Sequence, residues 1–288
     1  MPSSTFSTPL LSEELSGHLL PALRMSSIVF IVTIMMVLNR LLRLFTFPFP
    51  QHLYARYNAR WIIHPASRIL MRVIGVRMKV IGKISTTQQL VVSHHQGVID
   101  SLMLMALSPC MVISNTEIRG VSGVGWAMEQ LGFVFVNRSR RRSIQEVLEP
   151  TIAMVGLSKI NVGFFPEGMS NNGFEMLPFH SSFFQIAATS GAGVTPLAFQ
   201  YIQANKRPVT RADLDVFVYS SPKGSVVKYV YNMLRVRQVK IEVRVLEPIL
   251  HEEIQQQALS RKDLCGLAEQ RISEAFKARV IVEAPELL

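Results

Sequence analysis

A run of 14 uncharged, mostly apolar residues near the amino terminus, MSSIVFIVTIMMVL at residues 25–38, restricts the possible folds of this chain strongly. As a helix the run would be about 21 Å long, whereas the hydrocarbon core of a bilayer is about 30 Å thick. Arg40 and Arg43 follow it, and their long side chains could reach the membrane interface. The run therefore predicts a helix that spans a membrane, dips into one leaflet, or is buried in a protein core.

A second amphipathic stretch follows the proline-rich break at residues 48–50. Between residues 53 and 63, apolar and aromatic side chains are interleaved with Arg56 and Arg60, a pattern typical of helices that lie in a membrane interface. The two stretches together favour a membrane-anchoring helical pair over residues 25–75.

Basic residues are concentrated around this apolar segment. Residues 1–84 contain ten Lys and Arg against two acidic residues, which is +8 of the net charge of +10. Because cytoplasmic flanks of membrane helices favour Lys and Arg, we expect the chain on the cytoplasmic face of a membrane, the inner membrane in a bacterium. The segregated charge and the absence of a binding motif argue against a nucleic-acid partner. Glu13, Glu14 and the lack of a small-residue cleavage site argue against a signal peptide.

From about residue 78, short β-rich runs alternate with helix-length stretches, and this alternation predicts an α/β domain. We expect strands at 78–83, 89–93, 110–114, 133–137, 160–165, 194–200, 214–220 and 239–248, and helices near 98–107, 121–131, 143–157, 179–190, 225–236 and 259–279. The chain then divides into a tail (1–24), membrane-anchoring helices (25–75), an α/β domain (76–250) and a carboxy-terminal amphipathic helix with a tail (251–288).

The sequence SHHQGVID at residues 93–100 stands at an expected junction of strand and helix, a favoured place for a site. If the helix starts near Gly97, Asp100 falls in its first turn, where the helix dipole favours an ionised carboxylate. Such a carboxylate can hold the ring of His95. A neutral imidazole oriented in this way is a general base able to take a proton from an alcohol.

Three further polar blocks follow in order. Arg138 lies just beyond the hydrophobic strand that follows Gly132, and its guanidinium can fork onto a phosphate. The tight turn FPEG then supplies Glu167 and Gly168, and Pro196 lies in a later strand.

Other kinds of site fit the sequence less well. A serine hydrolase needs a G-x-S-x-G elbow, which the stretch around Ser170 lacks. A zinc site needs three converging ligands, whereas His94 and His95 are adjacent on an extended strand and point to opposite faces. We therefore expect no metal site.

The four blocks, in this order, resemble the pattern of the glycerolipid acyltransferase family, the PlsC-like lysophospholipid acyltransferases: N-H-x-S-x-x-D, G-x-x-F-[IV]-x-R, F-P-E-G-T and V-x-P. The resemblance covers about residues 78–250 and implies an α/β fold, with a mostly mixed sheet flanked by helices. It implies His95 as the catalytic base and Asp100 as its partner. It also implies an acceptor site at Gly132 and Arg138, a head-group and reaction pocket shaped by Glu167 and Gly168, and an acyl-chain side shaped by Pro196.

By this resemblance, the chain would move a fatty acyl group from acyl-CoA or acyl-ACP to the free hydroxyl of a lysophospholipid, with no further cofactor and with a phospholipid membrane as its partner. The favoured acceptor is 1-acyl-sn-glycerol-3-phosphate, giving phosphatidic acid. Asn115, Met169 and Ser170 stand where the family often carries a lysine and Thr-Arg. A lyso-ornithine lipid or a lysophosphatidylcholine-type acceptor therefore stays open, as does an inactive membrane-bound lipid-binding scaffold.

Overall fold

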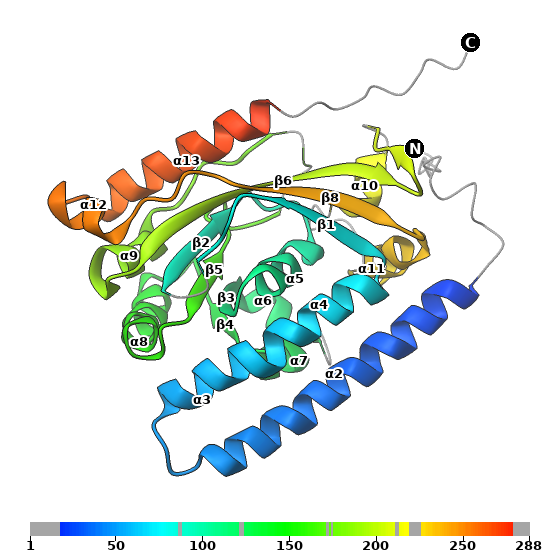
Figure 1. The fold of residues 1–288 in the computed structure, drawn as a ribbon, viewed down its shortest axis with the longest axis horizontal. Helices are drawn as coiled ribbons and strands as arrows, with labels where there is room; N and C mark the ends of the chain where they lie inside the picture. The colour runs from blue at the N-terminus through cyan, green and yellow to red at the C-terminus, as the bar shows by residue number, and fades with distance from the viewer. Residues whose placement is uncertain are drawn as a thin grey trace.

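The computed structural model of the chain describes residues 18–85, 88–120, 124–170, 173, 175–210, 213–218 and 226–278. These residues form one mixed β-sheet with helices on both faces and a two-helix arm next to it (Figure 1). The expected α/β fold with a mixed sheet flanked by helices is confirmed. Of the expected segments, residues 1–17, 121–123, 219–225 and 279–288 lie outside the described residues.

The sheet joins five parallel strands to a pair of strands that run the opposite way. β8 pairs antiparallel with β6, and β1 pairs parallel with β8. Apolar residues dominate the central strands, as expected for parallel strands that are covered on both faces. In spatial order the strands are β1 (Val76–Ile81), β8 (Val239–Val245), β6 (Gly193–Ala204), β2 (Gln89–Ser93), β5 (Asn161–Phe164), β3 (Cys110–Asn115) and β4 (Phe133–Val136), with β7 (Arg207–Pro208) paired to β6.

Side chains of each strand point alternately to the two faces of the sheet and enter two separate apolar clusters. In β2, Val91 belongs to one cluster, and Leu90 and Val92 belong to the other. Helices that contribute to the first cluster include α4 (His64–Val73), α5 (Val98–Leu107), α10 (Leu214–Phe217) and α11 (Val226–Arg235). The second cluster is covered by α8 (Arg141–Ser158), η2 (Ser182–Phe184), α9 (Gln185–Ser190), α12 (His251–Gln256) and α13 (Arg261–Lys277). The short helices α6 (Thr116–Arg119) and α7 (Val124–Gln130) connect β3 to β4.

The arm begins with the 28-residue helix α2 (Leu19–Thr46), which is longer at both ends than the apolar run from which it was predicted. A turn at residues 47–50 leads into α3 (Gln51–Tyr57), the π-helix η1 (Asn58–Ile63) and α4, which follow one another without a break. α2 is long and apolar enough to cross a membrane, and only 11% of its most apolar window is buried within the molecule. This exposure does not fit a buried core helix.

The strand expected at 214–220 is wrong: its described part forms the short helix α10. The carboxylate of Asp213 accepts hydrogen bonds from both terminal nitrogens of Arg207 and from the backbone N–H and hydroxyl of Thr210, and so fixes the turn that starts the helix. Phe217 then stacks on Tyr201 in β6. Tertiary contacts, rather than pairing in a sheet, therefore decide the conformation of this segment, in spite of its alternating apolar residues. The helix expected at 179–190 starts only at η2, so its first residues are not helical.

Candidate active site

His95 and Asp100 lie together where β2 ends and α5 begins. Asp100 is the third residue of α5, and its Oδ2 atom accepts hydrogen bonds from the backbone N–H groups of Gln96 (2.6 Å) and Gly97 (2.8 Å). The same Oδ2 lies 2.9 Å from Nδ1 of His95. Three donors therefore converge on one oxygen of a carboxylate whose side chain is fully buried.

This arrangement fixes the tautomer of His95. Because Asp100 accepts at Nδ1, the imidazole proton sits on Nδ1 and the lone pair sits on Nε2. The side chain of His95 is 19% exposed, so Nε2 can meet a substrate that enters from outside. Burial raises the pKa of Tyr201 well above its ordinary value, and the negative charge of Asp100 raises it further. Tyr201 therefore stays a neutral phenol near the pair.

The FPEG turn lies directly against His95. The ring of Phe165 stacks on the imidazole, with centroids 4.1 Å apart and planes 12° apart. Glu167 is buried, and its two carboxylate oxygens accept the backbone N–H groups of His95 (2.9 Å) and Leu177 (3.1 Å). Glu167 therefore ties together the backbones of two loops beside the imidazole.

Arg138 approaches the same turn from the end of β4. Its Nη1 donates to the carbonyl oxygen of Phe165 at 3.3 Å, and burial lowers the pKa of its guanidinium. Gly168 has φ +86°, and a Cβ there would lie 2.8 Å from Nη1 of Arg138 and 3.4 Å from the ring of His180. Glycine is thus required both for the backbone conformation and for the approach of Arg138. His180, whose N–H donates to the carbonyl of Pro166, was not among the predicted site residues.

Two predicted site residues have structural neighbours instead. Gly132 has φ +83°, and a Cβ there would lie 2.9 Å from Cδ1 of Ile63 in η1, so it allows the arm to pack close to β4. Pro196 lies inside the sheet, in register with Val92 of β2. Its carbonyl accepts the N–H of Leu246 at 3.0 Å.

The neighbouring histidines point to different surroundings. His94 is buried between the rings of Phe199 and Phe276, whereas His95 stacks on Phe165. Within the described part of the chain, no group of three or more His, Cys, Asp or Glu side chains is placed to hold a metal ion.

Known proteins share this domain. The family model described as Acyltransferase matches residues 76–200. A 1-acyl-sn-glycerol-3-phosphate acyltransferase from Neisseria gonorrhoeae is 31% identical over 128 residues, 44% of this chain and 50% of that protein. A lyso-ornithine lipid O-acyltransferase from Pseudomonas aeruginosa is 26% identical over 207 residues, 72% of this chain and 75% of that protein.

The fold also has a solved counterpart. The crystal structure of the 1-acyl-sn-glycerophosphate (LPA) acyltransferase PlsC from Thermotoga maritima aligns with a TM-score of 0.56 at 18% identity, over 91% of this chain and 98% of that one. In sequence, this chain spans about half the length of the Neisseria relative. The matched stretch at residues 76–200, which contains His95, Asp100, Arg138 and Glu167, is an acyltransferase domain and belongs to the PlsC-like glycerolipid acyltransferase family.

Proposed function

We propose that the chain is a membrane-associated O-acyltransferase that moves a fatty acyl group from an acyl thioester to the free hydroxyl of a lysophospholipid, with His95 as the general base. The observation that carries this proposal is the pair of His95 and Asp100, in which a buried carboxylate holds Nδ1 and leaves Nε2 to accept a proton. The donor would be acyl-CoA or acyl-ACP.

In the reaction, the acceptor hydroxyl gives its proton to Nε2 of His95 as its oxygen attacks the thioester carbonyl. A new C–O bond forms, the C–S bond of the tetrahedral intermediate breaks, and the leaving sulfur takes the proton from the imidazolium. Asp100 stabilises that imidazolium through its hydrogen bond with Nδ1, and the N–H groups of Gln96 and Gly97 hold its carboxylate in place.

Arg138 supports a phosphate-bearing acceptor, 1-acyl-sn-glycerol-3-phosphate. Its guanidinium is largely desolvated, and among the described residues its Nε has no hydrogen-bond partner. A phosphate monoester would supply both the missing acceptor and a countercharge. A lyso-ornithine lipid is the second candidate, because the Pseudomonas relative aligns over most of both chains.

Membrane association is supported by the outer surface of the arm. Large apolar side chains are exposed along α2, and aromatic ones gather around the turn into α3, including Phe45, Phe47 and Phe49. Trp61 in η1 is 68% exposed. Tryptophan favours the level of the lipid head groups, and exposed Phe rings gain free energy when lipid covers them. With the basic flank, they support a seat on the cytoplasmic leaflet.

The proposal is tested by acyl transfer with the purified chain in mixed micelles, from a labelled acyl thioester to lysophosphatidic acid, lyso-ornithine lipid and lysophosphatidylcholine in parallel. His95→Ala should abolish transfer to each acceptor used by the wild type, with vesicle binding unchanged, whereas His52→Gln on α3 should retain transfer. Comparable turnover by His95→Ala would remove His95 from the mechanism. No transfer by the wild type would support the inactive scaffold.

A further inference from the structure

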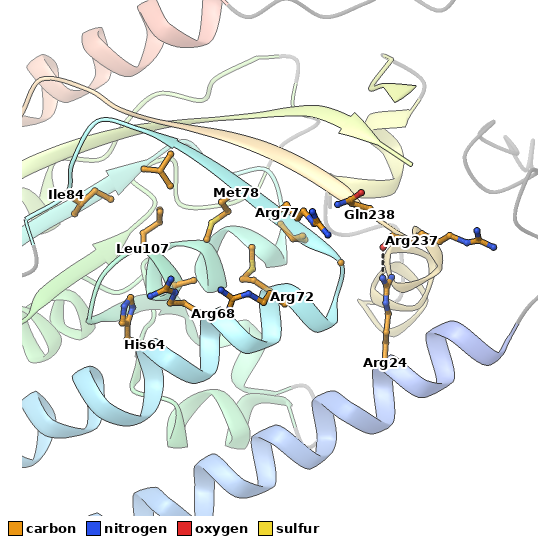
Figure 2. A pocket seen from close by; sticks show the side chains of 15 residues that line it. Arg24, His64, Arg68, Arg72, Arg77, Met78, Ile84, Leu107, Arg237 and Gln238 are labelled. Atoms are coloured by element: carbon orange, nitrogen blue, oxygen red, sulfur yellow. Dashed lines mark hydrogen bonds between the residues drawn. The ribbon is translucent and has the colours of Figure 1, made fainter. Parts of the chain in front are cut away.

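A cationic cavity of about 940 Å³ lies between α4 and the edge strand β1, at the face that α2 and α11 approach. Figure 2 shows the side chains of Arg68 and Arg72 between α4 and β1, with Met78 and Leu107 nearby. The arginines that line it are Arg24, Arg68, Arg72, Arg77 and Arg237, and no carboxylate among the described residues lines it.

The arginines of this cavity divide into two kinds. Arg24 has a structural role, because its guanidinium donates to the carbonyls of Leu234, Val236 and Arg237 at the end of α11. Arg68, Arg72 and Arg77 are exposed, and in the described part of the chain none of them forms an ion pair.

This charge is unfavourable for the isolated molecule. Arg68 and Arg72 are four residues apart on one face of α4, a spacing at which like charges destabilise a helix. Arg77 adds a third positive charge from β1. A cluster without acidic partners is explained if its countercharge comes from a ligand.

The cationic surface continues past β1. A second cavity of about 380 Å³ shares Arg77, Met78 and Gln238 with the first and adds Lys206 and Lys240. Lys79 also lines it, and this side chain forms an ion pair with Glu242. Two adjoining cavities with cations on both sides of β1 fit a ligand with several separated phosphates better than a single phosphate group.

We propose that these adjoining cavities bind the phosphates of coenzyme A, the nucleoside 3′-phosphate and the diphosphate, and thereby hold the acyl donor. This inference rests on the proposed acyl transfer and names the carrier that delivers the thioester to it. The apolar side chains of Met78, Ile84 and Leu107 lie beside the arginines and suit the hydrocarbon parts of the pantetheine chain of coenzyme A.

The position of the cavity relative to His95 fits this ligand. α5 starts three residues after His95 and ends at Leu107, which lines the cavity, so a helix about 15 Å long connects His95 to one wall of the cavity. The pantetheine arm of coenzyme A has about as many bonds as four residues of extended backbone, about 14 Å. The pantetheine chain is therefore comparable in length to the helix that connects His95 to the cavity wall at Leu107.

The cavity also lies away from the aromatic turn of the arm. Arg24 lies near the start of α2, and the exposed aromatic turn lies beyond its other end, about 33 Å away along the helix axis. If the aromatic turn enters the membrane, the cavity is at the remote end of the arm.

The test compares two donors with the same acyl thioester, acyl-CoA and acyl-pantetheine, in mixed micelles. The double variant Arg68→Gln/Arg72→Gln should raise KM for acyl-CoA at least tenfold, with kcat and the KM for acyl-pantetheine within twofold of wild type. The matched control Arg261→Gln/Lys262→Gln removes two exposed charges from α13 and should change neither KM. Equal effects on both donors, or no effect, would overturn the proposal.

A second measurement separates this proposal from the acyl transfer itself. Equilibrium dialysis of coenzyme A against the full chain needs no turnover, and we expect at least tenfold weaker binding by the double variant and weaker binding of 3′-dephospho-coenzyme A by the wild type. Unchanged coenzyme A binding, together with weakened binding of the double variant to vesicles containing phosphatidylglycerol, would assign the cluster to anionic lipid and overturn the proposal. If coenzyme A binds as expected but no acceptor is acylated, only the proposed function fails.

Discussion

At the level of single residues, the pair of His95 and Asp100 is recognisable from sequence because the two residues are close in the chain. His95 and Asp100 are five residues apart at a strand–helix junction, and local geometry brings them together. Phe165 and Glu167 could not be placed in the same way, because they reach His95 from about 70 residues further along the chain. Only the order of β2 and β5 in the sheet puts the FPEG turn against the imidazole.

Replacing Asp100, the partner of the proposed base His95, should test the role of the carboxylate charge. Asp100→Asn keeps the shape of the side chain but removes the negative charge that Nδ1, Gln96 and Gly97 share. We expect kcat to fall by about 10⁴-fold, as in other sites where an amide replaces the carboxylate that orients a histidine. Steady-state kinetics measures this, and a thermal melt checks that the variant is folded. A kcat within tenfold of wild type would show that the carboxylate is not needed.

The glycine of the FPEG turn should matter for the acceptor. Gly168→Ala places a Cβ at φ +86° and 2.8 Å from Nη1 of Arg138, so Arg138 must move. We expect a loss of about 1–2 kcal/mol in the free energy of unfolding. Relative to wild type, KM should rise more for an anionic acceptor than for a neutral one. Urea denaturation and kinetics with both acceptors measure these effects.

The matched control for this variant is Gly156→Ala in α8. A Cβ at Gly156 would meet no atom within 4 Å, so we expect a gain of about 0.5–1 kcal/mol in stability from the better helix former and no change in KM. Equal behaviour of the two alanine variants would contradict the assigned role of Gly168.

At the level of elements, the two strands that depart from the parallel sheet carry a charge network. Glu242 of β8 accepts from Lys79 of β1 and from Arg244. The hydrogen bond from Lys79 makes the largest contribution to lowering the pKa of Glu242, and the hydrogen bond from Arg244 makes the next largest. Because the folded pKa lies below the unfolded one, this contribution to stability is present above the unfolded pKa and is lost as pH falls through the folded pKa.

The pH dependence of unfolding should therefore report on this contact. Between pH 7 and pH 3, wild type should lose more stability than Glu242→Gln, whose amide does not titrate. Urea denaturation at several pH values measures the difference. Glu247→Gln, at an exposed glutamate after β8, should follow the wild-type profile. Parallel losses in wild type and Glu242→Gln would contradict the assignment.

The elements also show where sequence patterns are sufficient. The strands of the central sheet were predicted to within a few residues because burial on both faces demands apolar runs. The segment at 214–220 has the same pattern, yet its described part is helical. The hydrogen bonds of Asp213 with Arg207 and the stacking of Phe217 on Tyr201 decide this, and neither contact can be recognised from the apolar pattern.

At the level of the whole molecule, the surface that would contact lipid and the cavity that would bind a soluble donor are separate. The aromatic turn of the arm and the cationic cavity lie at opposite ends of α2, so a molecule seated by its aromatic turn would keep the cavity accessible to a soluble donor. His95 lies on the α/β domain, just before the start of α5, and the other end of this helix lines the cavity. Under the proposed function, this arrangement would allow an insoluble acceptor and a soluble donor to reach His95.

The seating itself can be measured from the aromatic turn. Phe47 is 81% exposed and Phe49 is 63% exposed, and burying each ring in lipid would contribute about 1.5–3 kcal/mol. Phe47→Ser/Phe49→Ser should therefore weaken binding to vesicles by about 100-fold or more. In a Trp126→Phe background, Trp61 is the remaining tryptophan, and lipids brominated near the head group should quench its fluorescence. Unquenched Trp61 and unchanged vesicle binding by the serine variant would show that this surface faces a protein or water, and the route of the acceptor to His95 would have to lie elsewhere.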